Sequence, residues 1–357
     1  MSIRGRLSRT KSDLYQILVR HPFLDALQYL ARNFNNKEQC RRIAGRDGLV
    51  LKCNSYGNSN QDKCIYYIRF GGAEHGFFGQ FRILLKYLAY ADRFGFYPVV
   101  EWPNNFPYAE KEGVRGIQNP FEYYFDQPMG ISLEDMRKSY NVFCGEEIHI
   151  TDFYLDKEIP GGEEGYMISE AFIERLAEIM RKYIRLNSWT ENYMQQEIGG
   201  LLQNKKTVGV HVRGSDYKKN YNNHPAIVPV KEYIRAAERL MRSGKYEQVF
   251  LATDDMEALE LFSSVFADKL VYYKDVIRTK GNVSVAFSKK RRNNHRYRLG
   301  LEVLRDMMSL AACDGLVAGI SQVSNCARIT RKSHEKNYED MVILDRGINH
   351  TRNDFVR

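Results

Sequence analysis

In the second half of the chain, short apolar runs alternate with longer segments in which apolar residues return every three or four positions. Short runs rich in Val, Phe and Leu are typical of buried strands, and the longer spacing is typical of amphipathic helices. The predicted strands are TVGVHVR (207–213), QVFLAT (248–253), KLVYY (269–273) and DGLVAG (314–319). The predicted helices are PVKEYIRAAERLMRSGK, MEALELFSSVF, RLGLEVLRDMMSLAAC and SNCARITRK. This alternation predicts a parallel sheet covered by helices on both faces.

The first half contains one unit of the same kind. The run CIYYIRF (64–70) predicts a strand, FRILLKYLAYADRFG a helix that ends at Gly95, and YPVVEW a second strand. Between the first strand and the helix, GGAEHGFFGQ is rich in glycine. Such a turn can present backbone N–H groups and a helix N-terminus to an anion, or it can be a tight turn without a ligand. It is not a Walker A loop, because no Gly-Lys-Ser/Thr follows it.

The remaining segments are less regular. Residues 102–166 are rich in Pro, Gly and aromatic residues, and we expect loops and short elements that line a cleft. Residues 169–202 carry a helical pattern with a break near Asn187–Ser188, and we expect them to connect to a second domain. The pattern over 12–33 is also helical and is broken at Pro22. This stretch either packs on its own domain or lies as a surface helix against anionic membrane.

The length of 357 residues suits two domains. We place an N-terminal α/β domain at 1–200, a Rossmann-like domain at 201–340 and a C-terminal tail at 341–357. With 43% hydrophobic and 27% charged residues, the chain has the composition of a globular protein. No apolar run reaches the roughly 18–20 residues of a membrane span. No apolar segment follows the basic start, so we expect no secretory signal either.

The net charge of +9 and the isoelectric point of about 9.1 favour acidic partners, namely nucleotides, nucleic acid, anionic lipid or phosphorylated sugars. Part of this charge lies in SKKRRNNHRYR (288–298), which is either a solvated loop or a contact for a diphosphate or anionic lipid. The sequence has no RNA- or DNA-binding motif, so nucleic acid is not an expected partner. The cysteines form neither a CxxC pair nor a cluster with zinc-site spacing, which favours reduced thiols and predicts no metal site.

Three of the predicted strands end in polar residues. HVRGSD ends the first, ATDD (252–255) ends the second, and GISQVSN (319–325) follows the fourth. Ligands of parallel α/β sheets bind at the carboxyl ends of the strands, so we expect these segments to face one crevice. There Arg213 can reach a phosphate and Gly214 can let the backbone approach it, while the helix that opens at 321–325 can offer N-terminal amides.

Each of these features also has a purely structural interpretation. Arg213 and Asp216 could form a structural ion pair at the strand end. Asp254 and Asp255 could cap the helix that follows them. His211 could be a hydrogen-bonded core residue. The residues by themselves leave both interpretations open.

The segments HVRGSDY, FLATDD and RDMMSLAACDGLVAGISQ, in this order and spacing, resemble the three motifs of the α-1,6-fucosyltransferase superfamily. That group includes the N-glycan core enzymes, the rhizobial nodulation enzymes and, more distantly, the protein O-fucosyltransferases and α-1,2-fucosyltransferases. NHRY (294–297) and GFFGQFRILLKYLAYADRFGFYPVVEW also fit the pattern of the core enzymes. The resemblance covers residues 64–102 and 207–330, and its motifs are specific for the superfamily but not for an acceptor.

The resemblance implies a GT-B fold, in which two Rossmann-like domains face each other across a cleft. It implies GDP-fucose as the donor substrate, inversion at the anomeric carbon, and neither a metal nor another cofactor. Arg213 would hold the β-phosphate, and His211 and Asp306 would read the guanine. The donor-binding residues that it implies are His211, Gly214, Asp254, Asp255, Asp306, Ser321, Gln322, Ser324, Asn325, Gly76 and Gly79.

A metal-independent reaction is chemically consistent with these residues. Negative charge grows on the leaving diphosphate, and many transferases neutralise it with a cation held by a DxD motif, which this sequence lacks. An arginine and helix-end amides can supply the positive charge instead. The helix-end contact would come from Ser321 and Gln322, or from Ser324 and Asn325 if the loop aligns with a gap.

Two positions depart from the family pattern. The core enzymes carry two adjacent arginines in the first motif, whereas Gly214 holds the second position here, and Arg115, Arg292 or Arg296 could supply the missing contact. The glutamate that serves as base in those enzymes is also missing, because YKKNYNNHPAIVPVK (217–231) contains no carboxylate. The remaining candidates for the general base are Asp216, His224 and Glu74.

We therefore expect a cytoplasmic glycosyltransferase that transfers L-fucose from GDP-fucose to a glycan hydroxyl. Its partners would be the GDP-sugar donor and a glycan acceptor, and a lipid-linked acceptor would bring it to the anionic membrane surface. Two alternatives remain. One is a transferase for another GDP-hexose, and the other is a non-catalytic nucleotide- or RNA-binding α/β protein.

Overall fold

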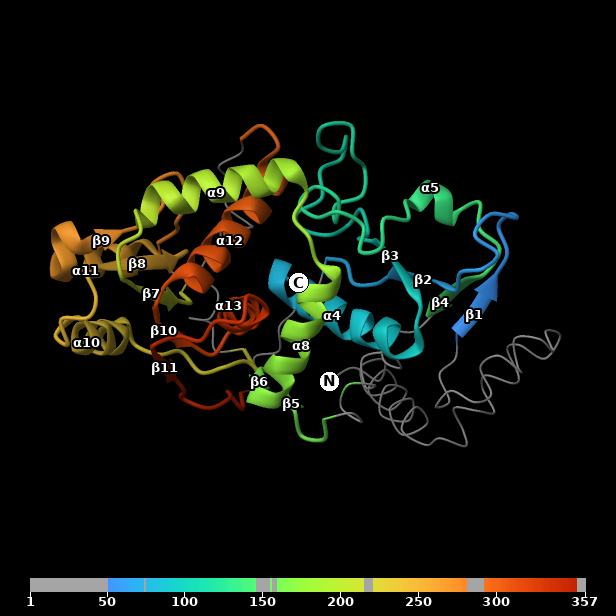
Figure 1. Cartoon of the computed structure of the whole chain (residues 1–357). Helices are drawn as coiled ribbons and strands as arrows, with labels where there is room; N and C mark the ends of the chain where they lie inside the picture. Colours follow the sequence, from blue (N-terminus) through green and yellow to red (C-terminus); the bar gives the residue numbers. More distant parts are fainter. Residues whose placement is uncertain are drawn as a thin grey trace. The chain divides into compact units, whose positions relative to one another are not determined.

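The computed structural model of the chain describes residues 51–73, 75–145, 155, 159–214, 221–280 and 292–351 (Figure 1). The predicted helices within 12–33 lie outside this part. The chain divides into two compact units whose segments are interleaved along the sequence. Unit 1 contains the described residues up to Phe70 and those within Lys86–Glu101 and Gln127–Pro160. Unit 2 contains those within Gly71–Leu85, Trp102–Asp126 and from Gly161 onward.

Unit 1 is built on a sheet with the strand order β1-β4-β2-β3. Its elements are β1 (Leu51–Asn54), β2 (Ile65–Arg69), β3 (Tyr97–Glu101), β4 (Val142–Gly145) and the short helix α5 (Leu133–Met136). The strand β2 pairs in parallel with both β3 and β4, and β1 pairs antiparallel with β4. Helix α4 (Phe77–Phe94) connects β2 to β3, which confirms the predicted βαβ unit. The strands β1 and β4 were not predicted.

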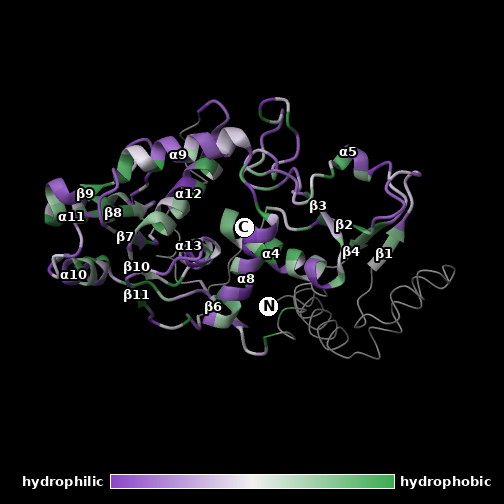
Figure 2. Cartoon of the chain, viewed as in Figure 1, coloured by the Kyte–Doolittle hydropathy of each residue, from purple (hydrophilic) through white to green (hydrophobic). Residues whose placement is uncertain are grey.

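One core cluster of unit 1 lies between this sheet and α5. Ile65, Val99 and Val142 from three strands pack with Ile131 and Met136. Each of these side chains is buried, and the two central strands alternate residues between the two faces as a pleated sheet requires. Figure 2 shows α4 mostly in the hydrophobic colour, whereas α8 (Glu170–Tyr183) of unit 2 is largely hydrophilic.

In the described part of unit 2, five parallel strands form a sheet with the order β11-β10-β7-β8-β9. The strands are β7 (Thr207–Val212), β8 (Gln248–Thr253), β9 (Leu270–Val271), β10 (Gly315–Gly319) and β11 (Asp340–Leu344). The first four confirm the predicted strands and the α/β class. The fifth differs from the expectation, because four of its residues come from the segment that was assigned to a tail. These residues form a strand because they pair with β10, which lies about 25 residues earlier in the sequence.

Helices cover both faces of this sheet. The remaining elements are β5 (Glu163–Glu164), β6 (Met167–Ile168), α9 (Ser188–Leu202), α10 (Val230–Met241), α11 (Met256–Phe266), the 3₁₀ turn η2 (Ala267–Lys269), α12 (His295–Ala312) and α13 (Gln322–Ser333). In Figure 1, α10 lies on one side of the strands and α9 and α12 on the other. The predicted break before α9 is confirmed, because Asn187 caps that helix by accepting a hydrogen bond from the Thr190 N–H at 2.9 Å. No helix in the described residues is both long enough and apolar enough to cross a membrane.

A cluster of buried aromatic side chains fixes the position of α12. Tyr124 is fully buried, and its hydroxyl donates to the Tyr297 carbonyl oxygen at 2.9 Å. The Tyr124 hydroxyl also lies against Gly300, where a Cβ atom would overlap it. Because the tyrosine ring is rigid, the absence of a side chain at Gly300 is what allows α12 and Tyr124 to approach each other this closely.

Alanine substitution at two helical glycines should change the stability in opposite directions, because only Gly300 is in close contact with another side chain. We expect Gly300→Ala to destabilise the protein by about 1–3 kcal/mol, because overpacking forces the Tyr124 ring to move. Gly200, on α9, is exposed, and a Cβ atom added there would meet no other atom within 4 Å. Gly200→Ala should therefore stabilise the protein by about 0.5–1 kcal/mol through helix propensity. Urea unfolding of the full chain measures both changes, and equal effects of the two variants would contradict the packing argument.

Candidate functional site

The strand order of unit 2 reverses between β7 and β10. From β7 the chain proceeds outward to β8 and β9, and it then returns on the other side to form β10 and β11. His211 near the end of β7 stands in register with Ala252 of β8 and Ala318 of β10. The three polar strand ends are therefore neighbours, at the position where open parallel sheets bind ligands. We call His211, Arg213, Gly214, Asp254 and Ser321 the strand-end site.

Arg213 and Gly214 both contact Asp254. The Arg213 Nη1 atom lies 4.0 Å from Asp254 Oδ2, and the Gly214 N–H donates to Asp254 Oδ1 at 3.3 Å. The Arg213 side chain is 32% exposed, so this ion pair is partly solvated and weak. Asp254 orients the guanidinium at the carboxyl end of the sheet, where it can still meet an anion.

Asp255 has a structural role. It is 1% exposed, and its Oδ1 atom accepts a hydrogen bond from the Glu257 N–H at 3.0 Å, which caps α11. The N-cap interpretation is therefore confirmed for this residue. A Cβ atom on Gly214 would overlap the Asp255 side chain. Contact with Asp255 thus requires glycine at position 214, independently of any ligand.

The amino end of α13 borders the same strand ends. Ser321 accepts from the Ser324 N–H at 3.1 Å, and Ser324 Oγ accepts from the Ser321 N–H at 3.0 Å. These reciprocal bonds occupy both hydroxyl groups. The amides of Gln322 and Val323 have no acceptor within the helix, and the first turn carries no acidic residue. The helix end therefore offers these amides and its positive dipole to an anion.

His211 is a neutral member of the site. It is 6% exposed, and its Nδ1 atom lies 3.3 Å from Ser321 Oγ. Burial, and to a smaller extent the positive charge of Arg213, lower the pKa of His211 to about 4. At neutral pH the imidazole is therefore uncharged, so the positive charge here resides on Arg213.

Asp306 lies on α12, and burial raises its pKa to about 7, against the opposing effect of Arg278 and Arg305. A loop over residues 272–279 joins this helix to the strand-end site. In the middle of the loop, Asp275 accepts from Arg305 at 2.6 Å. At its carboxyl end, the Thr279 N–H donates to the Asp254 carbonyl oxygen at 3.0 Å.

His224 lies beside the start of α13. Its ring centre is 5.5 Å from that of Tyr166, whose carbonyl oxygen accepts from Asn325 Nδ2 at 2.9 Å. His224 Nδ1 lies 3.1 Å from the Asn222 carbonyl oxygen. A carbonyl oxygen only accepts, so this contact favours the proton on Nδ1 and the lone pair on Nε2. Asp216 and Glu74, the other candidate bases, lie outside the described residues.

The glycine turn precedes α4 directly. A Cβ atom at Gly76 would meet nothing within 4 Å, and one at Gly79 would meet only His75 at 3.9 Å. Packing therefore requires neither glycine, and the backbone there stays open to approach. Cys326 Sγ of α13 lies 4.0 Å from the Phe78 carbonyl oxygen, which brings the start of α4 next to α13.

The arginines considered for a second phosphate contact have other partners. Arg115 donates to the Tyr297 hydroxyl at 2.9 Å, Arg292 pairs with Glu302 at 2.5 Å, and Arg296 bonds a backbone carbonyl oxygen. No contact in the described residues joins them to the strand-end site. Arg278, in the loop that ends at Thr279, is a cation that the sequence analysis did not consider.

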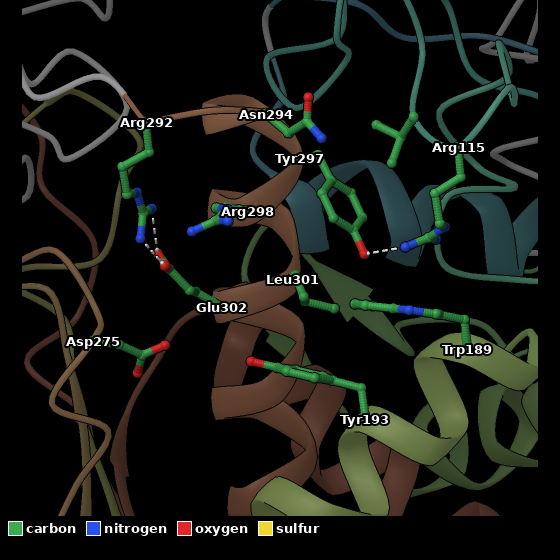
Figure 3. Close-up of a pocket in the computed structure, with 11 residues that line it drawn as sticks. Arg115, Trp189, Tyr193, Asp275, Arg292, Asn294, Tyr297, Arg298, Leu301 and Glu302 are labelled. Atoms are coloured by element: carbon green, nitrogen blue, oxygen red, sulfur yellow. Dashed lines mark hydrogen bonds and ion pairs between the residues drawn. The ribbon is translucent and has the colours of Figure 1, made fainter.

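A pocket of about 490 Å³ lies at the amino end of α12 (Figure 3). We call it the Trp189 pocket, and its lining is Val114, Arg115, Trp189, Tyr193, Asp275, Arg292, Asn294, Tyr297, Arg298, Leu301 and Glu302. This pocket was not predicted from the sequence. The signal was the spacing of Trp189 and Tyr193, four residues apart on one helix. In the described residues, no group of His, Cys, Asp or Glu side chains could hold a metal ion.

No family model and no curated protein sequence matches the chain. Among solved structures, NodZ α-1,6-fucosyltransferase co-crystallised with GDP is 17% identical, with a TM-score of 0.45 over 75% of this chain and 92% of that one. Another NodZ structure, from Bradyrhizobium, is also 17% identical, with a TM-score of 0.42 over the same shares. POFUT1 in complex with GDP-fucose is 13% identical, with a TM-score of 0.43 over 78% of this chain and 97% of that one. These likenesses are distant, and the function must be argued from the residues of the site.

Proposed function

We propose that the chain is an inverting, metal-independent glycosyltransferase that moves L-fucose from GDP-fucose to a glycan hydroxyl. The observation that carries the proposal is that the end of β7, which Arg213 follows, and the end of β10, which opens α13, are neighbours at the reversal point of the sheet. Arg213 and the amino end of α13 both present positive charge where a parallel α/β sheet binds its ligand. A nucleoside diphosphate is the anion that fits such a pair, with the guanidinium on one phosphate and the amides on the other.

These groups would act on the leaving diphosphate. The bond between the fucose anomeric carbon and the β-phosphate oxygen breaks, and its electron pair stays on GDP. Arg213 and the amides of Gln322 and Val323 would stabilise that growing charge, with no rearrangement needed during the reaction. A new bond forms from the acceptor oxygen to the opposite face of the anomeric carbon. The acceptor proton passes to a general base.

His224 is the candidate base that the described residues support best. Its Nδ1 contact with a backbone carbonyl oxygen favours the tautomer in which Nε2 is the basic nitrogen, and Nε2 would take the acceptor proton. Its neighbour Tyr166 is bonded to Asn325, so the imidazole lies next to the helix end that would hold the diphosphate. Asp216 and Glu74 remain predicted alternatives.

His211 and Asp306 are proposed to read the guanine. An ionised Asp306 could accept from the two adjacent N–H donors of guanine, N1 and N2. The neutral His211 ring can both donate and accept one hydrogen bond. A protonated Asp306 could not accept both hydrogens, so guanine binding should favour its ionised form.

Thermal-shift measurements test the proposed donor and the role of Arg213 together. We expect GDP and GDP-fucose to raise the melting temperature and UDP and RNA to leave it unchanged. A ligand at about 100 times its Kd stabilises by about 2.7 kcal/mol. Arg213→Ala should lose most of this shift and lower GDP-fucose hydrolysis about 10²–10³-fold, because it removes a charge that acts on the leaving group.

The matched control is Arg242→Ala, on α10. That side chain is 78% exposed and pairs only loosely with Glu238 at 3.7 Å, so its removal should change neither readout. Near-normal hydrolysis by the folded Arg213→Ala protein would refute the role of Arg213. A larger shift with another GDP-hexose would reassign the donor. A shift with RNA and none with GDP would favour the non-catalytic alternative.

Proton release tests the role of Asp306. Its pKa of about 7 means that the carboxyl holds a proton below neutral pH, and binding of guanine must expel it. Affinity for GDP-fucose should therefore rise as the pH increases towards about 7 and level off above it, by up to tenfold per pH unit. The sugar-substituted diphosphate of this ligand has no proton to lose in that range.

Calorimetry at about pH 6 in two buffers of different ionisation enthalpy measures this release, which should approach one proton per ligand. Asp306→Asn should bind more weakly, with no proton release, whereas the exposed Asp268→Asn should behave as the unmodified protein. A constant affinity between about pH 5.5 and pH 8 would rule out Asp306 as the guanine acceptor.

A further inference from the structure

The Trp189 pocket has the size and lining of a small-molecule site, and it lies outside the strand-end site. Its volume of about 490 Å³ falls within the range of ligand pockets. We infer that it binds one neutral, equatorially substituted hexopyranose ring of the glycan acceptor. The assignment of this ring to the acceptor rests on the proposed function, whereas the binding of a sugar ring in the pocket does not.

The floor of the pocket is aromatic and rigid. Trp189 is 42% exposed, and its ring lies parallel to that of Tyr193, with an interplanar angle of 7° and 5.4 Å between the centres. The Arg115 guanidinium covers part of the indole at 4.1 Å and is itself held by hydrogen bonds to the Tyr297 hydroxyl and the Tyr123 carbonyl oxygen. An exposed, immobilised indole offers apolar area with little loss of side-chain entropy on binding.

The rim carries hydrogen-bonding groups of both kinds. Figure 3 shows Arg298 and Glu302 on α12, with Arg292 paired to Glu302 and Asp275 facing the same space. The Asp275 side chain is 59% exposed, and the Nε atom of Arg292 is buried without a partner in the described residues. Carboxylates accept and guanidinium groups donate, so the rim can satisfy hydroxyl groups that do both.

This combination favours a sugar ring over a nucleobase. A pyranose with equatorial hydroxyls has an apolar face of C–H groups that can lie on an indole, and its hydroxyls radiate around the edge. The donors and acceptors here likewise surround an aromatic floor. The lining carries two carboxylates, Asp275 and Glu302, against three arginines, Arg115, Arg292 and Arg298, so the charges nearly balance and the pocket has no strong preference for an anion.

The loop over residues 272–279 connects the pocket to the strand-end site. Asp275 lines the pocket and is fixed by Arg305 at 2.6 Å. Four residues later, Thr279 is bonded to the Asp254 backbone, and Asp254 contacts Arg213. A sugar in the pocket would thus contact this loop at Asp275, and the same loop is bonded at Thr279 to Asp254 of the strand-end site.

Tryptophan fluorescence reports on this pocket directly. The chain contains two tryptophans, and the other, Trp102, is fully buried. We expect cellotetraose and laminaritetraose, whose glucose rings are equatorially substituted, to change the emission in a saturable manner. Sorbitol has the hydroxyl groups but no ring, and it should have no effect. The full chain is used throughout.

Two variants and their controls locate the response. Trp189→Ala should abolish it, and Arg298→Ala, which removes an exposed rim donor and cannot disturb a core, should weaken it at least threefold. The matched controls Tyr140→Ala, an exposed aromatic residue that is 46% accessible, and Arg242→Ala should keep the full response. A response that persists in Trp189→Ala would place the sugar elsewhere and overturn the inference.

Absence of a saturable change with both saccharides up to about 20 mM would also overturn it. So would a response to guanosine alone, which would assign the pocket to a nucleobase. The outcome is separate from that of the proposed function, because GDP-fucose binding is measured by thermal shift. A fluorescence response without a GDP-fucose shift would keep the sugar site and refute the transferase, and the reverse result would refute only the sugar site.

Discussion

A single buried guanidinium ties together the elements on which both sites depend. Arg305 of α12 is 1% exposed, and it bonds Asp275 of the loop and Glu197 and Tyr193 of α9 while stacking 3.8 Å above the Tyr273 ring. A buried charge is costly unless it is paired, so loss of any of these contacts would destabilise the protein, and the partners are held to α12. One residue thereby positions the floor of the Trp189 pocket and the loop that reaches the strand ends.

Burial also decides which groups carry charge near the strand ends. His211 is desolvated and stays neutral, and desolvation favours the protonated, uncharged form of Asp306. The charge that remains is the partly exposed guanidinium of Arg213, next to helix amides that no acidic side chain neutralises. Such an arrangement favours the binding of an anion, with the positive charge supplied by the arginine and the helix amides instead of a metal ion. His211 as a neutral ring and Asp306 in its ionised form are the groups proposed to recognise a ligand by hydrogen bonding.

The predictability of the fold differed from element to element. The strands β7 and β8 and the helices α10 to α12 follow from local periodicity, because each is long and repeats its own pattern, and the short strand β10 follows from its continuous apolar run. The strands β1, β4 and β11 were missed, since each is defined by pairing with a partner far away in the sequence. Glycine at position 214 was explained by ligand approach, whereas the buried side chain of Asp255 accounts for it.

By itself, the sequence determined which segments form strands and helices and which of them end in polar residues, because these properties depend on neighbours within a few positions. It also carried the motifs from which a donor class was proposed. Only the tertiary structure decided that β7 lies between β8 and β10, that burial holds His211 neutral, and that Trp189 lines a pocket with Asp275. Strand order, desolvation and cavities arise from contacts between distant residues, and local periodicity does not record such contacts.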